Sequence, residues 1–235
     1  RINKAADDAA GLAIAEGFRS VVRGTQVAQR NTQDGVSLVQ TAEGALSETT
    51  NILQRVRELA VQSANGTNST NNRVALNQEV NQLLSQIDDI AYDTEFNGIA
   101  VLSSATTLTL QTGARVGQNL SIIVNAATAG SLAISTANIS TAAGALSALS
   151  QVDVALQSVN SLRSNLGAFQ NRLEFTINTL AIQEENSAAS ESAIRDADIA
   201  RETIQFTRNQ ILVSAGTSVL AQSNVVPQTA LQLLG

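Results

Sequence analysis

Residues 39–63, VQTAEGALSETTNILQRVRELAVQS, carry a seven-residue repeat that decides the fold. The repeat places two rows of side chains on one helix face: Val39, Leu46, Leu53 and Ala60, and then Ala42, Thr49, Val56 and Ser63. Rows separated alternately by three and four residues are typical of a coiled-coil seam. A neighbouring row of Leu38, Ala45, Ile52 and Leu59 widens the stripe, which indicates burial against more than one partner helix. The pattern predicts a long helix from about Lys4 to Ser63.

Five glycines oppose this long helix: Gly11, Gly17, Gly24, Gly35 and Gly44. Each glycine in a helix interior costs about 1 kcal/mol relative to alanine. Burial of one Leu or Val returns about 1.5–3 kcal/mol, so the stripe after Gly35 outweighs the penalty. Before Gly35 the balance is closer, and we expect a helix that allows a bend and the close approach of another chain.

A second helix is predicted after the polar turn cluster NGTNSTNN at residues 65–72. It runs from Arg73 to about Tyr92. Its apolar residues are spaced 4, 3, 4 and 3, as a coiled-coil seam requires: Leu76, Val80, Leu83, Ile87 and Ile90. Two seams joined by a short turn predict an antiparallel helix pair.

The middle of the chain changes character near Glu95. Segments Thr107–Gln111 and Leu120–Val124 are rich in β-forming residues, and the glycine-containing segment 112–119 between them predicts a hairpin loop. Residues 126–145, rich in Ala, Ser and Thr, are predicted to form a surface connection.

Helix is predicted again from about Thr141. Its seam has mostly three-four spacing and consists of Val159, Leu162, Leu166, Phe169, Leu173 and Leu180. A last helix is predicted over about Ser190 to Asn224 and is ended by Pro227. Arg201 and Arg208 interrupt its apolar face, which indicates polar partners; that face comprises Ile194, Ala197, Ile204, Ile211 and Ala215.

The predicted fold is therefore mainly α: a long antiparallel helical bundle or coiled-coil rod with a small β-hairpin region in the middle. We expect four parts. Residues 1–103 form the N-terminal helical half of the rod and residues 104–140 a short β-containing outer region. Residues 141–189 form the C-terminal helical half, and residues 190–235 form an inner-core helix.

Composition excludes several functions. The formal net charge is −6 and the 14 basic residues are scattered, which argues against nucleic-acid binding and against an anionic membrane surface. The sequence has no Cys and no His, so thiolate metal sites and the usual Ser-His-Asp or Cys-His catalytic groups are impossible. We expect no cofactor. The sequence also shows no apolar run long enough for a transmembrane helix and no opening signal peptide.

Adjacent carboxylates offer no better case for catalysis. Asp7-Asp8, Asp88-Asp89 and Glu184-Glu185 diverge by about 100° on a helix, so solvated helix faces are the preferred interpretation. The apolar seams exceed what one slender rod covers internally, and only 14% of residues are charged. Such a chain is expected to oligomerise or to hold partner helices.

The sequence closely resembles the bacterial flagellins at both ends. The N-terminal resemblance lies in RINKAADDAAGLAIAEGFRS, in the segment from NTQDGVSLVQ to VQSANGTNS, and in DTEFNG at 93–98. The C-terminal resemblance lies in GAFQNRLEFTINTL, ESAIRDADIARET and QILVSAGTSVLAQSNVVPQTALQLLG. These matches cover about two-thirds of the chain, in family order and spacing.

This resemblance implies a structural subunit that assembles with other flagellin subunits into an extracellular helical filament used for motility. The helical halves would form the inner core, and residues from about Ser104 to Ser140 the outer surface. The chain begins with Arg1, so we expect the family's extreme N-terminal arm to be missing. The middle of the chain is short, so we expect the large outer domains of many flagellins to be missing as well. The family also implies export through the flagellar type III apparatus, an export chaperone on the C-terminal helix, and contacts with filament cap and hook-associated proteins.

The resemblance further implies recognition by a host Toll-like receptor. The expected contacts are Gln54, Arg55, Glu58, Leu59 and Gln62, with Glu79 on the adjacent helix. For Leu59, which sits on an apolar row, helix packing is an equal alternative. A cytosolic host sensor is expected to read Leu231, Leu233 and Leu234, although Gly235 departs from the Arg that many members carry.

Two other functions remain open at this point. The hook–filament junction protein shares its terminal helices with flagellin, but the QRVRELAVQ and VPQTALQLL matches favour flagellin. A surface adhesin would need exposed aromatics or charges in the middle of the chain, and residues 104–150 offer neither.

Overall fold

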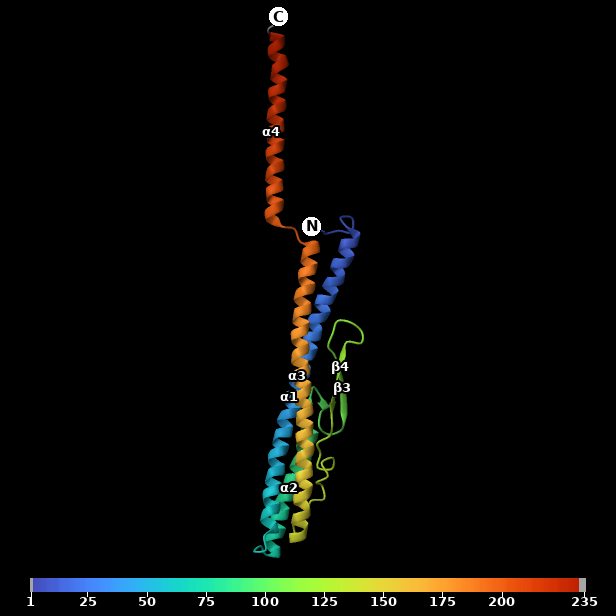
Figure 1. Ribbon diagram of the computed structural model, residues 1–235, viewed down its shortest axis with the longest axis vertical. Helices are drawn as coiled ribbons and strands as arrows, with labels where there is room; N and C mark the ends of the chain where they lie inside the picture. The colour runs from blue at the N-terminus through green and yellow to red at the C-terminus, as the bar shows by residue number, and fades with distance from the viewer. Residues whose placement is uncertain (1, 233–235) are drawn as a thin grey trace. The chain divides into compact units, whose positions relative to one another are not determined.

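The computed structural model describes residues 2–232, with side chains described over residues 2–223. This part of the chain contains four helices and two antiparallel strand pairs (Figure 1). The helices are α1 (Ala9–Ala64), α2 (Thr70–Asp93), α3 (Ala142–Arg195) and α4 (Ile199–Gln232). The strands are β1 (Glu95–Phe96), β2 (Ile99–Ala100), β3 (Thr106–Gln111) and β4 (Asn119–Val124). The predicted mainly α fold with a small β region is confirmed.

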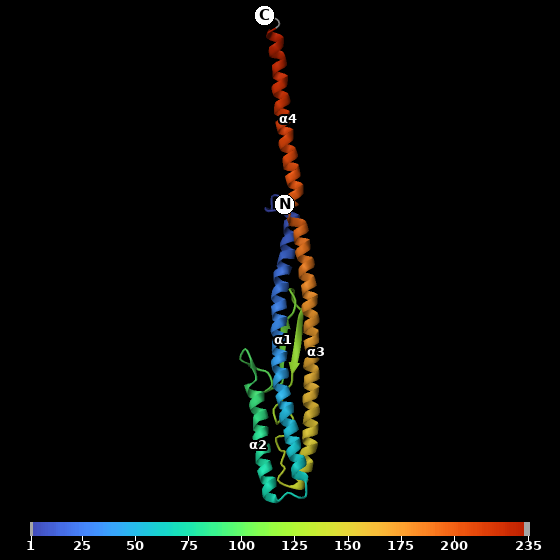
Figure 2. The same cartoon turned by 90° about the vertical axis from the view of Figure 1, so that its left-hand side faces the viewer.

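The chain divides into two compact units. The larger unit is Ser20–Ser187, and the smaller comprises the described part of residues 1–19 and 188–235. Within the larger unit α1, α2 and α3 run side by side, and both α2 and α3 run antiparallel to α1 (Figures 1 and 2).

The repeat in α1 is the centre of the larger unit's core. All eight side chains of its two rows are buried, including Leu46, Leu53 and Val56 at 0% exposure. Because α1 contacts both other helices of the bundle, the flanking residues Leu38 and Leu59 are buried as well. The helix continues without a break through its glycines, so seam burial outweighs their cost.

The facing seams of α2 and α3 follow the same spacing. On α2, Val80, Leu84, Ile87 and Ala91 are buried, whereas Leu76 and Leu83 are half-buried against the core. On α3, the buried positions recur every three or four residues up to Val159 and every seven residues after it: Ala145, Ala148, Val152, Ala155, Val159, Leu166, Leu173 and Leu180. Phe169 packs at the edge of this core.

Helix boundaries follow capping side chains. α1 begins at Ala9, later than expected, because the Asp8 carboxylate accepts hydrogen bonds from the Ala10 and Gly11 amides at 3.1 and 2.9 Å. α2 begins at Thr70, earlier than expected, because the Ser69 side chain accepts the Asn72 N–H at 3.2 Å.

The expected bounds of the last two helices were wrong. Ser190 lies inside α3, and the break falls at residues 196–198, where Asp198 accepts hydrogen bonds from the Ala200 and Arg201 amides and starts α4. Pro227 does not end α4, which continues to Gln232. A proline removes one amide donor, and the turns on either side of it keep the helix.

The predicted hairpin is confirmed, with each strand one residue longer than expected. β3 pairs with β4 from Thr106↔Val124 to Gln111↔Asn119. Leu120, Ile122 and Val124 are buried and the intervening residues of β4 are exposed, which is the alternation of a strand with one covered face. A second strand pair, β1–β2, was not expected; its turn holds Asn97 and Gly98 at φ of 52° and 74°, as an Asn-Gly hairpin turn requires.

The connection at residues 126–145 is not the surface segment that its composition suggested. Its small apolar residues alternate with polar ones and enter the core; Ala127, Ala129, Leu132, Ile134, Ala137 and Ile139 are all buried. Two side chains of α2 hold its backbone: Asp88 accepts the Ala129 N–H and Asn77 accepts the Ile139 N–H, each at 2.8 Å. Asp88 is therefore a loop anchor rather than part of a solvated face.

Candidate functional site

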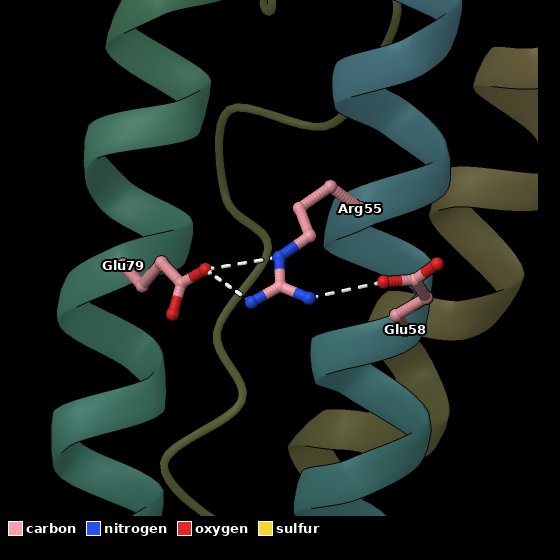
Figure 3. Close-up of polar contacts among 3 residues, drawn as sticks. All are labelled: Arg55, Glu58 and Glu79. Carbon is pink, nitrogen blue, oxygen red and sulfur yellow. Dashed lines mark hydrogen bonds and ion pairs between the residues drawn. The ribbon is translucent and has the colours of Figure 1, made fainter.

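The strongest candidate site is an exposed, ion-paired face on α1 and α2 (Figure 3). The Arg55 guanidinium lies between two carboxylates. Its Nε and Nη2 donate to Glu79 Oε1 at 3.0 and 2.8 Å, and its Nη1 donates to Glu58 Oε2 at 3.0 Å. Arg55 and Glu58 are one helical turn apart on α1, and Glu79 reaches across from α2.

This cluster is exposed to solvent: the side chains of Arg55, Glu58 and Glu79 are 51%, 67% and 44% exposed. The hydrogen bonds to Glu79 and then to Glu58 raise the pKa of Arg55, so the guanidinium stays charged at any ordinary pH. Exposed ion pairs contribute little stability. What the arrangement supplies is a fixed charged surface with one cation and two carboxylates.

Neighbouring side chains extend this face along α1. Gln54, Arg57, Glu58, Val61 and Gln62 line a shallow surface hollow. Arg57 at its edge donates to Asp153 Oδ1 of α3 at 3.0 Å. We call Gln54, Arg55, Glu58, Gln62 and Glu79 the charged face; the structure brings these five expected receptor contacts together at the surface.

Leu59, the sixth expected contact, does not belong to the charged face. Its side chain is 1% exposed and is part of the hydrophobic core. It lies on the inner side of α1 because it is the last member of the row that widens the buried stripe. The structure therefore gives Leu59 a packing role, the alternative that its sequence position had left open.

The α4 helix presents a different surface. Within residues 199–223 every side chain is exposed, including Ile204, Phe206, Ile211 and Leu212. The apolar face of α4 is shorter than the sequence predicted, because two of its five expected residues lie outside the helix: Ile194 belongs to α3 and Ala197 to the break before α4. Of the expected cytosolic-sensor residues, Leu233 and Leu234 lie outside the described residues, and Leu231 lies where only the backbone is described.

Neither surface resembles a catalytic centre. Within the described part of the chain, no cluster of three His, Cys, Asp or Glu side chains could hold a metal ion. Among the same residues, no helix has the length and apolar character needed to cross a membrane.

Known proteins match the chain over nearly its whole length. The family model for the bacterial flagellin N-terminal helical region matches residues 1–107, and that for the bacterial flagellin C-terminal helical region matches residues 149–234. A flagellin of Halalkalibacterium halodurans is 47% identical over 237 residues, which cover all of this chain and 87% of that protein.

Solved structures of flagellar proteins also match this chain. The crystal structure of Bacillus cereus flagellin is 34% identical, with a TM-score of 0.57 over 64% of this chain and 88% of that one. A putative flagellar hook-associated protein from Vibrio parahaemolyticus has a TM-score of 0.66 over 83% of this chain and 100% of that one; at 13% identity it shows a shared fold alone.

Long helices that bury one another's seams, together with these matches, define a structural protein of the bacterial flagellum and not an enzyme. The chain belongs to the flagellin family and is a structural subunit of the flagellar filament.

Proposed function

We propose that this chain polymerises into the filament through α4, whose partner helices come from the assembled homopolymer. The supporting observation is the uncovered apolar surface of α4, where Ile204 and Ile211 are 69% and 62% exposed. Side chains of this size seldom remain in water along a whole helix unless a partner covers them.

Before assembly the same surface of α4 suits an export chaperone. Export through the flagellar type III apparatus would place the chain outside the cell. Filament cap and hook-associated proteins are the expected partners at the polymer ends.

Seeded polymerisation followed by electron microscopy tests this proposal. The full-length protein should extend filament seeds. Ile211→Asp should abolish extension, because it places a charge on the surface to be covered, whereas Gln205→Asp is the matched control outside the apolar row. Folded monomers that never extend a seed, or an Ile211→Asp variant that extends seeds as well as the wild type, would contradict assembly through α4.

The charged face supports a second role, as a ligand for a host Toll-like receptor. Its side chains are exposed, and the Arg55 hydrogen bonds hold Glu58 and Glu79 in place. A partner would therefore meet a partly preorganised surface at a lower ordering cost. Arg55→Ala should abolish a Toll-like-receptor reporter response. Arg172→Ala, at another exposed arginine, is the control; an unchanged response to Arg55→Ala would remove the assignment.

The cytosolic-sensor role of Leu231, Leu233 and Leu234 stays a proposal that rests on the resemblance of the C-terminal sequence. It predicts that a Leu233→Ala/Leu234→Ala variant delivered into the cytosol of host cells loses the sensor response while keeping the Toll-like-receptor response. Equal loss of both responses would point to unfolding instead.

A further inference from the structure

We propose that the turn between α1 and α2 modifies itself: the Asn65 side-chain amide is hydrolysed through a cyclic imide formed with the Gly66 nitrogen, and Arg73 promotes the reaction. This proposal does not rest on the assembly or receptor-binding roles proposed above. It combines a reactive dipeptide with a buried cation aimed at the reacting peptide group.

The dipeptide Asn65-Gly66 is open to this reaction. Both residues are exposed in the turn that follows α1. Gly66 has no Cβ to hinder approach of its nitrogen to the Asn65 Cγ. The Asn65 Oδ1 accepts the Thr67 N–H at 3.3 Å, which folds the side chain back over the intervening peptide group. The Gly66 N–H itself makes no hydrogen bond within the described part of the chain.

Arg73 supplies the activation. It is only 8% exposed, and its Nη2 donates to the Asn65 carbonyl oxygen at 2.9 Å. The Asn68 N–H donates to the same oxygen at 3.2 Å. The Asn65 carbonyl oxygen and the Gly66 N–H belong to the same peptide group. When the Gly66 nitrogen loses its proton, the negative charge is shared with this oxygen. The oxygen accepts hydrogen bonds from two donors, and one of them, the Arg73 guanidinium, is cationic. Donors aimed at developing charge lower the barrier to its formation.

No carboxylate among residues 2–223 neutralises the Arg73 charge. Arg73 makes no ion pair with a carboxylate among residues 2–223, and its buried Nη1 has no hydrogen-bond partner there. An unpaired buried cation favours any nearby negative charge. It therefore favours both the amide anion that attacks and the carboxylate that results.

The chemistry balances with water as the only co-reactant. A bond forms between the Gly66 nitrogen and the Asn65 Cγ, the Cγ–Nδ2 bond breaks, and ammonia leaves with the proton taken from the Gly66 nitrogen. Water then opens the imide at either carbonyl. The product is aspartate at position 65, or isoaspartate, in which the main chain passes through the former side chain.

The sequence contains an internal comparison at Asn97-Gly98. This second Asn-Gly dipeptide is also exposed, but it forms the β1–β2 turn, with both residues at positive φ and flanked by the Phe96↔Ile99 pair. No guanidinium hydrogen bond to Asn97 is present among the described residues. Asn97 should react more slowly than Asn65.

The test is incubation of the purified chain at neutral to mildly alkaline pH, followed by peptide mass spectrometry and an isoaspartate assay. Product should accumulate at Asn65 first, and faster as the pH rises. Gly66→Ala should slow it about tenfold. That variant keeps the fold, because a Cβ at Gly66 meets nothing within 4 Å and Gly66 needs no positive φ. Absence of product at position 65, or equal rates at Asn65 and Asn97, would overturn the proposal.

The Arg73→Gln variant tests whether Arg73 activates the Gly66 nitrogen or only restrains the turn. Glutamine keeps a donor but removes the charge, so the proposal requires a drop of about tenfold in the folded protein. In urea, wild type and Arg73→Gln should react at the same rate, because the contact to Asn65 is lost. If Arg73→Gln instead speeds the folded protein's reaction, Arg73 merely restrains the turn and its proposed role is wrong.

Discussion

Gly24 of α1 and Ala114 of the β3–β4 loop approach so closely that a Cβ built on Gly24 would stand 2.8 Å from the Ala114 Cβ. The Ala114 Cα would lie 3.3 Å from the same added atom, so the backbone of the loop also blocks it. Nearby, the Asn31 side chain donates to the Gln111 carbonyl oxygen at 3.2 Å. The hairpin is thus seated on α1 at a notch that only glycine provides, and this explains why α1 tolerates the helix penalty there.

Gly24→Ala should therefore loosen the hairpin, although alanine is the better helix former. We expect amide hydrogen exchange in β3 and β4 to accelerate about tenfold, because the loop must move off α1. The double variant Gly24→Ala/Ala114→Gly moves the methyl group from one side of the contact to the other and should restore protection. Gly44→Ala, where nothing lies within 4 Å, should instead stabilise the unit by about 0.5–1 kcal/mol. Unchanged exchange in Gly24→Ala would show that the notch is not needed.

Asn77 anchors the connection that leads into α3, since its Oδ1 accepts the Ile139 N–H at 2.8 Å. Asn77→Ala leaves that amide without a partner in a partly buried place, which should cost about 1–2 kcal/mol. Urea unfolding of wild type and variant measures the difference. Gln78→Ala, on the exposed side of the same helix, should change the free energy of unfolding by no more than about 0.5 kcal/mol. Equal effects of the two substitutions would contradict the anchor.

Much of the fold could be predicted because its helices are specified by local spacing. The rows containing Leu46 and Val56 repeat over several turns, and a repeat of that length has one structural solution. The positions of the connections depend instead on contacts between distant residues. Nothing local distinguishes the buried Ile134 from an exposed residue in a Ser- and Thr-rich segment; its place is set by packing against the helices.

The candidate site, too, could be predicted from the sequence only in part. The one-turn spacing of Arg55 and Glu58 could be derived from the sequence, whereas their pairing with Glu79 depends on the register of α2 against α1. Leu59 shows the limit. It follows Glu58 directly, yet the 100° rotation per residue turns it into the core. The role of Arg73 was not expected at all, because its neighbour Asn65 comes from the other end of the turn.

Asp7 should make the turn before α1 sensitive to acid. Its carboxylate accepts hydrogen bonds from the Lys4 and Asn3 amides at 2.9 and 3.1 Å, and these bonds, Lys4 first, hold the pKa of Asp7 below its ordinary value of 3.8. A lowered pKa means that the stabilisation is present above the unfolded value and is lost as the pH falls through the folded one. Carboxyl titration followed by NMR should give an Asp7 midpoint below 3.8. Asp7→Ala should open the turn already at neutral pH; a midpoint at or above the ordinary value would contradict the assignment.

The final prediction concerns the repeat in α1 that determines the bundle. Leu53 is fully buried among the seams of the larger unit, so Leu53→Ala should cost about 2–5 kcal/mol through lost burial and the cavity left behind. Leu146→Ala on α3 is the matched control, because Leu146 is 62% exposed and its truncation removes little buried area. Thermal or urea unfolding of both variants gives the comparison. If the seam were only a surface for other subunits, Leu53→Ala would leave the isolated chain as stable as Leu146→Ala does and would weaken polymerisation alone. The complete burial of Leu53 within a single chain predicts the opposite order, with unfolding of the chain affected first.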